Sequence, residues 1–236
     1  FGLESGFVFG IVMAVLVAIV IIGGIKRIGR VTEKIVPFMA IIYVGAALVI
    51  IFMNITIIPT AIGQIWTGAF GDNSLLGGFI GVMIVGFQRA AFSNEAGVGS
   101  ASIAHAAVKT RFPASEGIVA SIGPFVDTVI ICTMTALVLI ITGNVVSENA
   151  SLNDAQAILL TSSAFESVIS WFPYVLTVAV VLFAFSTMIS WSYYGFQGWA
   201  YLFGRTKKME YAYKLLFCVF VVIGSAASLG SVIGFS

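Results

Sequence analysis

The sequence predicts an all-α membrane protein, and two observations support that prediction. Of the 236 residues, 60% are hydrophobic and only 9% are charged, whereas soluble domains carry roughly 25% charged residues. The apolar residues also gather in runs of about the 20 residues that a helix needs to cross a bilayer. We therefore predict a single transmembrane domain over residues 1–236. The sequence shows no basic stripe that would indicate nucleic-acid binding.

Five uninterrupted apolar runs form most of the predicted domain. They cover residues 7–25, 35–53, 118–142, 172–202 and 212–235. Pro37 falls in the first turn of the second run, where a helix tolerates a residue without an N–H group. Pro124 falls inside the third run, and we expect it to kink that helix. The last run is rich in Gly, Ala and Ser, whose small side chains let membrane helices approach closely.

A sixth element, residues 75–108, is predicted as a helix with a break in its middle. Its apolar halves, 75–85 and 101–108, flank the segment GFQRAAFSNEAGVGS at 86–100. Neither half is long enough to cross a bilayer alone. Lipid cannot hydrogen-bond the free backbone groups of such a break, so the break must face protein or a wet cavity. Paired short helices of this kind indicate the binding site of a transporter.

The basic residues predict the orientation of the domain. All but one of the 11 Lys and Arg residues lie in or beside three alternate loops, predicted at 26–34, 109–117 and 204–211. By the positive-inside rule these loops are cytoplasmic, which gives six crossings that start and end outside. The long outer loop, 143–171, contains an amphipathic segment. We interpret it either as a helix packed on top of the bundle or as an extracellular lid over a pathway.

Four ionisable side chains fall within or near membrane depth, where such groups are costly and usually face a cavity or a partner. Arg89 and Glu95 either form an ion pair that holds the break or act in gating and substrate contact. His105 is either a hydrogen-bonded packing residue or a proton relay. Asp127 has four open roles: binding a cation, carrying a coupled proton, capping a neighbouring helix, or accepting a hydrogen bond from a tyrosine.

The run at 172–202 carries a polar face. Its members share one side of a helix: Ser186, Thr187, Ser190, Trp191 and Tyr194. Hard cations prefer oxygen ligands, and the hydroxyls of Ser186 and Thr187 with the carbonyl of Phe183 would supply three. Alternatively, these hydroxyls bond back to their own helix. No enzyme is predicted, because the chain lacks a metalloprotease HExxH, a P-loop lysine and a nucleophile elbow.

Two segments resemble the alanine/glycine:cation symporter family of sodium-coupled amino-acid carriers. They are GFQRAAFSNEAGVGSASIAHAAVKTRF from Gly86 and GGIKRIGRVTEKIVPFMAIIY from Gly23. The resemblance covers essentially the whole chain and implies a LeuT-like inverted-repeat transporter bundle. This chain would hold about core helices four to nine of a longer carrier. The broken element then resembles core helix six, the run at 172–202 core helix eight, and 143–171 the external lid.

The same resemblance implies roles for single residues. Ser186 and Thr187 match a hydroxyl pair that holds sodium. Gly86, Phe87 and Gln88 match the unwound segment beside the substrate. Trp191 would face the same cavity, where its bulk suits alanine or glycine. Asp127 has no counterpart in the family.

The resemblance also implies the ligands and the location. The expected partners are an amino-acid substrate, co-transported sodium and the lipid bilayer of the plasma membrane. Core helix one, which supplies the other half of both sites, lies outside this chain. Two alternatives stay open: a proton-coupled carrier of the same fold with Asp127 as the relay, and a channel or structural membrane subunit.

Overall fold

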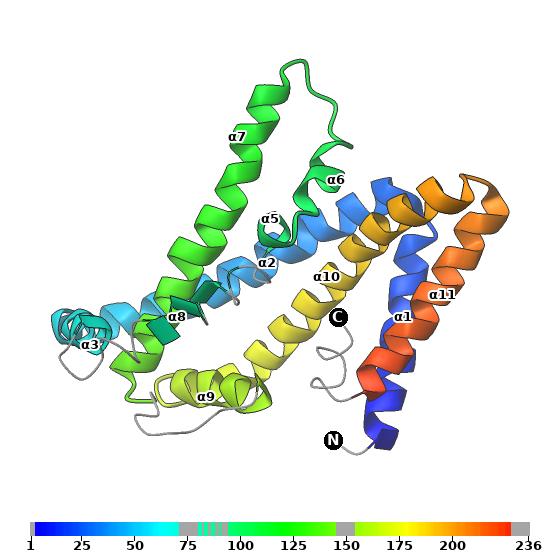
Figure 1. Cartoon of the computed structure of the whole chain (residues 1–236). Helices are drawn as coiled ribbons and strands as arrows, with labels where there is room; N and C mark the ends of the chain where they lie inside the picture. Colours follow the sequence, from blue (N-terminus) through cyan, green and yellow to red (C-terminus); the bar gives the residue numbers. More distant parts are fainter. Residues whose placement is uncertain are drawn as a thin grey trace. The chain divides into compact units, whose positions relative to one another are not determined.

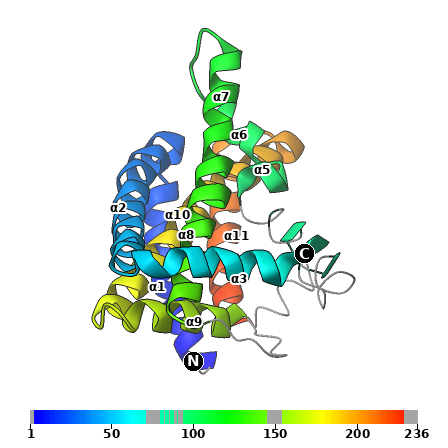
Figure 2. The same cartoon turned by 90° about the vertical axis from the view of Figure 1, so that its left-hand side faces the viewer.

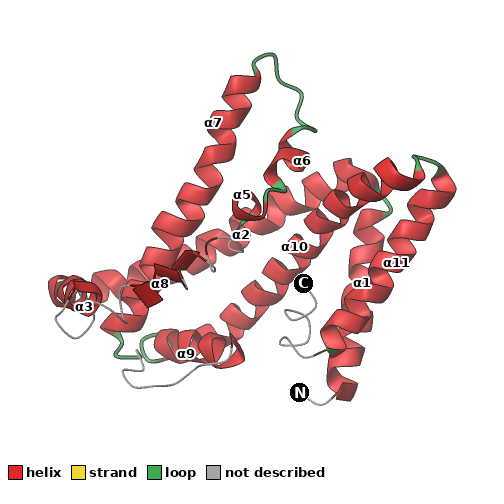
Figure 3. Cartoon of the chain, viewed as in Figure 1, coloured by secondary structure: helices red, strands yellow, loops and turns green. Residues whose placement is uncertain are grey.

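Every element in the described part of the protein is helical (Figure 3). The computed structural model describes these residues: 3–70, 80, 81, 83, 84, 86, 87, 90, 94–144 and 154–227. The chain divides into two compact units, Phe1–Met39 with Val180–Ser236, and Ala40–Ala179. Two long helices, α2 (Gly24–Met53) and α10 (Phe172–Phe203), contribute residues to both units.

In the first unit, α1 (Leu3–Ile21) and α11 (Lys207–Ala226) lie side by side (Figure 1). Two glycines on α1 permit the close approach. A Cβ on Gly6 would lie 2.9 Å from the carbonyl oxygen of Ser225, and a Cβ on Gly10 would meet the Ser225 hydroxyl. Small residues let membrane helices pack this closely. The tight packing predicted for the small residues of the last run is therefore present at Ser225.

The apolar core of the first unit joins three helices. Its buried members are Val17, Val20 and Ile21 of α1, Ile28 of α2, and Ile189 of α10. The chain turns sharply between α1 and α2 at Gly24, whose φ of 68° lies in the left-handed region that favours glycine. Ile28 is only one turn into α2 and is already buried, so this core anchors the start of that helix.

The segment 26–34, predicted as a loop, is helical, which corrects that expectation. α1 ends at Ile21 and α2 begins at Gly24, so the basic residues of this segment form the first turns of α2. Lys and Arg are good helix formers, and burial of Ile28 gives this part of α2 an inner face. The loops predicted at 109–117 and 204–211 are also shorter. Helix α7 begins at Pro113, and α11 begins after Thr206, whose hydroxyl accepts the N–H of Met209.

The second unit contains the remaining elements. They are η1 (Ile55–Ile57), α3 (Ile58–Phe70), α5 (Glu95–Val98), α6 (Ala101–His105), α7 (Pro113–Pro124), η2 (Phe125–Ile131), α8 (Cys132–Ile141) and α9 (Asp154–Glu166). Helix α3, which packs crosswise on α8 (Figure 2), was not predicted. Its 13 residues are too few for a span and its apolar pattern is interrupted, so the search for spanning runs passes over it.

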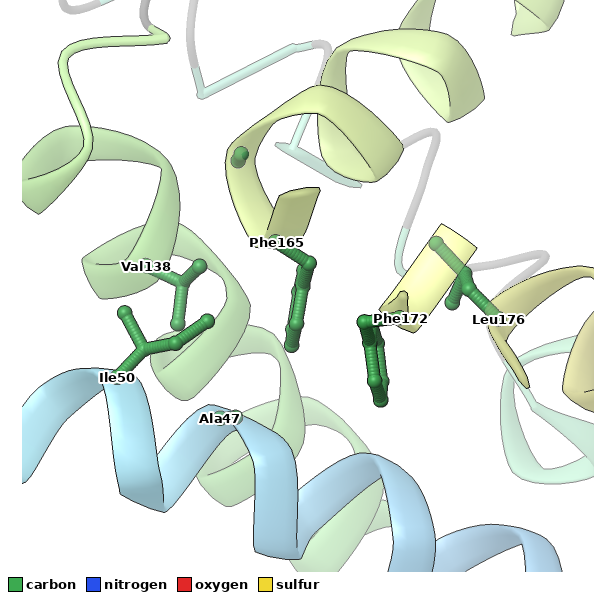
Figure 4. Packing of buried hydrophobic residues seen from close by; sticks show 7 residues of the cluster. Ala47, Ile50, Val138, Phe165, Phe172 and Leu176 are labelled. Carbon is green, nitrogen blue, oxygen red and sulfur yellow. The ribbon is translucent and has the colours of Figure 1, made fainter. Parts of the chain in front are cut away.

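The second unit has an apolar core in which side chains of α9 are buried (Figure 4). Phe165 of α9 is fully buried, and its ring stacks on Phe172 with the centroids 4.7 Å apart. The Phe165 ring also packs on Tyr43, at a centroid distance of 5.4 Å. Tyr43 in turn shares a 2.6 Å hydrogen bond with the hydroxyl of Thr135 on α8. The helix predicted within the outer loop is thus confirmed as α9.

Four helices of the described part are long and apolar enough to cross a membrane. They are Gly24–Met53, Pro113–Ile141, Phe172–Phe203 and Lys207–Ala226. A shorter apolar helix, Gly6–Ile21, corresponds to the first predicted span. Each of these five overlaps one of the uninterrupted runs predicted from the sequence. The number of crossings and the side on which each loop lies stay predictions.

Candidate functional site

The segment after the first half of the broken element is organised by Asn94. This residue is the N-cap of the four-residue helix α5: its side-chain oxygen accepts the N–H groups of Ala96 and Gly97, at 3.0 and 3.4 Å. The helix ends at Gly99, whose φ of 86° is left-handed. Ser100 follows, and α6 begins at the next residue. Among the described residues, the end of the break is therefore the short helix α5, which a glycine turn joins to α6.

Ser100 is the most unusual polar residue of this turn. Its side chain is only 8% exposed, and its hydroxyl has no hydrogen-bond partner among the described residues. Buried polar atoms nearly always have a partner. We therefore place Ser100 among the candidate functional residues of the break.

A second irregular helix lies beside the break. Directly after Pro124, the chain forms a π-helical segment, η2, in which the N–H of Cys132 bonds to the carbonyl of Asp127, five residues earlier. The helix type therefore changes directly after Pro124, and the kink expected there stays a prediction. The hydroxyl of Thr128, next to Asp127, accepts a 3.5 Å hydrogen bond from the Asn94 amide. π-Helical turns inside α-helices frequently mark functional sites.

Asn94 therefore does two tasks that substitution can separate. Alanine removes both the cap and the contact to Thr128, and we expect the Asn94→Ala protein to lose about 0.5–2 kcal/mol of stability, as other N-cap deletions do. Aspartate keeps the oxygen that caps α5 but lacks the amide donor to Thr128. We expect Asn94→Asp to retain the thermal unfolding midpoint of the full-length protein while losing the hydrogen bond that joins α5 to η2. Equal unfolding midpoints for Asn94→Ala and wild type would contradict the capping role.

His105, at the end of α6, has a defined partner. Its Nδ1 lies 2.6 Å from Oε1 of Glu116, in the first turn of α7. The two side chains are 33% and 19% exposed, so the pair is only partly shielded from solvent. This contact joins α6 to α7 across the intervening loop. His105 is therefore hydrogen-bonded, and the contact does not test its alternative role as a proton relay.

The residues predicted beside the substrate are described in part. Gly86 and Phe87 are helical, and the Phe87 side chain is 70% exposed. Gln88 and Arg89 lie outside the described residues, so the predicted contact between Arg89 and Glu95 is not tested. Glu95 is the first residue of α5, directly after the cap Asn94. An acidic residue in a helix's first turn interacts favourably with the helix dipole.

The predicted sodium ligands occupy the part of α10 that belongs to the first unit. Ser186 is buried, at 6% exposure, and its hydroxyl donates a 2.9 Å hydrogen bond to the carbonyl of Phe183. Thr187 is exposed, and its hydroxyl has no partner within the described ranges. The Ser186 hydroxyl thus bonds back to its own helix, which was the alternative interpretation. The lone pairs of the Ser186 hydroxyl oxygen stay available to a cation. A cation bound to the carbonyl oxygen of Phe183 would compete with the Ser186 hydroxyl proton for that oxygen.

Trp191 is 40% exposed and lies about one turn after these residues. Its ring meets Tyr194 edge to face, with centroids 6.0 Å apart. The indole thus contacts Tyr194 and is partly exposed, and its role as the wall of a pocket stays a prediction. Trp191 and Ser186 belong to the first unit, whereas Glu95 and Asp127 belong to the second. The predicted proximity of these two groups stays a prediction.

Asn94, Thr128 and Ser100 were not among the predicted site residues, although the sequence signals one of them. An Asn before a Glu at the start of a helix is a recognised capping pattern. The partnership of Asn94 with Thr128 has no such signal, because 34 residues separate them. The burial of Ser100 likewise depends on tertiary packing. Among the described residues, no group of three or more His, Cys, Asp or Glu converges.

Comparison with known proteins identifies close similarities over the whole chain. A model of the sodium:alanine symporter family matches residues 1–236. A sodium/alanine symporter of Methanococcus maripaludis is 42% identical over 230 residues, covering 97% of this chain and 50% of the relative. A probable sodium/glutamine symporter of Bacillus subtilis is 33% identical over 93% of this chain and 45% of the relative. A putative sodium/proton-dependent alanine carrier of Bacillus subtilis is 34% identical over 86% of this chain and 44% of the relative.

The chain thus spans about half the length of the curated relatives it matches. The matched family and these relatives are transporters and not enzymes, which agrees with the prediction that the chain has no catalytic site. The membrane-length helices and the family match together make this an integral membrane protein.

Proposed function

Because this chain belongs to the sodium:alanine symporter family, we propose that the whole protein is a secondary active transporter that couples sodium entry to the uptake of alanine or glycine. The observation that carries the proposal is the 42% identity to a sodium/alanine symporter over 97% of the chain. Sodium moving down its gradient supplies the free energy. One charge crossing 100 mV contributes about 2.3 kcal/mol before any concentration term.

For the fold, we propose a LeuT-like bundle of which this chain forms about core helices four to nine. The support comes from the interrupted element, in which α5 and α6 are short pieces joined at a left-handed glycine. Such discontinuous helices line the midplane sites of inverted-repeat carriers. The first core helix, which would complete both sites, lies in the half of the relatives that this chain does not match.

The proposed sodium site consists of the hydroxyls of Ser186 and Thr187 with the carbonyl of Phe183. Hydroxyl and carbonyl oxygens suit a hard cation. The burial of Ser186 supports the proposal, because a shielded oxygen interacts more strongly with a charge than a solvated one does. The hydroxyl of Thr187, which has no partner among the described residues, is proposed as a second ligand.

The proposed substrate site joins Gly86, Phe87 and Gln88 of the broken element with Trp191 of α10. In the full carrier these groups would line one cavity at the membrane midplane. A tryptophan wall excludes large side chains by volume, which favours alanine or glycine. Backbone groups freed at the break would bind the substrate's charged ends.

Three ionisable residues are proposed to act in gating or coupling. Arg89 and Glu95 flank the break, and Asp127 occupies the π-helical segment whose neighbour Thr128 contacts Asn94. Helix α9 within residues 143–171 is the proposed extracellular lid. The basic segments near 26–34, 109–117 and 204–211 would face the cytoplasm, with the protein in the plasma membrane.

The test is alanine uptake by the full-length protein in liposomes. With an inward sodium gradient, we expect alanine to accumulate above its external concentration. Replacing sodium by potassium should reduce uptake to the level of protein-free vesicles. Uptake that is indifferent to sodium would overturn the coupling, and flux that never exceeds equilibration would indicate a channel.

A second candidate is coupling to protons, since a relative 34% identical to this chain carries the name sodium/proton-dependent alanine carrier. Asp127 is the group of the described region best placed for this role, within the π-helical segment beside the break. In that case a pH gradient without sodium would drive uptake, and Asp127→Asn would abolish it. Retention of sodium-driven uptake in the same variant would separate the two mechanisms.

A further inference from the structure

A basic cavity lies at the turn between α1 and α2, away from the groups assigned to transport. It has a volume of about 430 Å³ and is lined by Gly23, Lys26, Arg27, Arg30 and Val31. Ligand pockets typically have roughly 300–1,000 Å³. All of its lining residues belong to the first unit, and in Figure 1 the turn is where blue α1 leads into α2.

Four of the lining residues, Lys26, Arg27, Arg30 and Val31, occupy a single face of α2, and Gly23 directly precedes this helix. Their spacing of three and four positions along the helix places their side chains one above the other. Ile28 lies on another face, buried against the α1 core. Because Ile28 packs in this core, the opposite side of the first turns of α2 faces outward, and the side chains of Lys26, Arg27 and Arg30 are exposed. Gly23 adds room at the turn, because a Cβ there would collide with the Arg27 side chain.

The three cations of the cavity have no acidic partner within the described ranges. The acidic side chain on nearby α11, Glu210, is already paired with Lys214 of the same helix at 2.6 Å. Lys214 also lies 3.5 Å from the carbonyl of Ile22, which places that pair close to the turn. The free N–H groups at the start of α2 add positive potential. The cavity is therefore complementary to an anion and unsuited to the ammonium group of an amino acid.

We infer that this cavity binds the phosphate head group of an anionic phospholipid. Arginine pairs with phosphate through parallel charge-assisted hydrogen bonds, and basic pockets at the cytoplasmic ends of membrane helices bind anionic lipid head groups. The flanking residues favour a lipid over a soluble anion. Ile22 and Ile25 are 58% and 43% exposed, so apolar surface for acyl chains adjoins the cations.

Native mass spectrometry of the full-length protein, titrated with phosphatidylglycerol or phosphatidylcholine, tests this site. We expect wild type to bind the first phosphatidylglycerol about tenfold more tightly than phosphatidylcholine, and Arg27→Gln/Arg30→Gln to lose about that factor. The control Lys207→Gln/Lys208→Gln removes the same charge from the start of α11 and should leave this affinity unchanged. Arg27→Lys/Arg30→Lys, which keeps the charge, should bind with intermediate affinity.

Three outcomes would overturn the proposal. Equal affinity of wild type for the two lipids would show that the head-group charge is not recognised. An equal loss in the α11 control would show a general charge effect and not a site. Displacement of phosphatidylglycerol by inorganic phosphate at the same concentration would assign the cavity to a soluble anion. The first and third comparisons use wild type alone, so they hold even if a variant fails to fold.

Discussion

We expect Ser186→Ala to raise the sodium concentration for half-maximal alanine uptake by about 10- to 100-fold, the range for losing one bond to a charged group. The physical reason is the burial of Ser186, whose hydroxyl oxygen is shielded from water. At saturating sodium, the maximal rate should stay near that of wild type, because the variant weakens binding of the ion and not the motion that carries it. Ser186→Thr should restore most of the affinity.

The same helix provides a matched control in Ser192. That serine is 4% exposed and donates a 2.7 Å hydrogen bond to the carbonyl of Ile189, three residues earlier. Ser186 has the same arrangement with Phe183. If both hydroxyls only bond back to their helix, Ser186→Ala and Ser192→Ala will have equal effects. A change in sodium dependence that is confined to Ser186 is the result that the proposed site requires.

Phe165→Ala should produce the largest loss of stability, about 3–5 kcal/mol, as large-to-small core substitutions of Phe do. The ring is fully buried, stacks on Phe172 and packs on Tyr43. Its removal leaves a cavity between α9 and the helices beneath it. Phe165→Leu retains apolar volume but loses the ring contacts, and we expect about 0.5–1.5 kcal/mol for that change. Denaturant unfolding of the full-length carrier in detergent measures both.

The control for Phe165 lies on the same helix. Leu159 of α9 is 65% exposed, so Leu159→Ala removes a similar apolar group from outside the core and should cost little. A comparable loss at both positions would mean that α9 is stabilised along its whole length and not through Phe165. Transport by Phe165→Leu is informative as well. If α9 is the lid, loosening its anchor should change the rate of uptake at a temperature where the protein stays folded.

The membrane class, the helical fold and the main spans follow from the sequence because lipid leaves few alternatives. Every backbone polar group within the bilayer must be paired inside its own segment, so an apolar run of spanning length is a helix. Residues 172–202 illustrate this: the observed helix, Phe172–Phe203, differs by one residue at its C-terminal end. Of the interrupted element predicted at 75–108, the short helices α5 and α6 are described, whereas most of its first half lies outside the described residues, so the complete element stays a prediction.

The ends of helices were less predictable, because charge and helix formation are independent properties. The Lys and Arg residues at 26–34 predicted a cytoplasmic loop, and the chain there is helical from Gly24 onward. The positive-inside rule concerns which side of the membrane a segment occupies and not its backbone conformation. Helix α3 was missed for a different reason. Its 13 residues are too few to resemble a membrane span.

The sequence by itself determined the class of protein, the family and the residue types available for ion and substrate binding. Only the tertiary structure decided which of those residues meet. The contact of Asn94 with Thr128 and the packing of Phe165 on Tyr43 each join segments that are distant in sequence. The physical reason is the distance over which each interaction acts. A bilayer acts on every residue of a run in the same way, whereas a hydrogen bond or ring contact depends on a few ångströms that only packing sets.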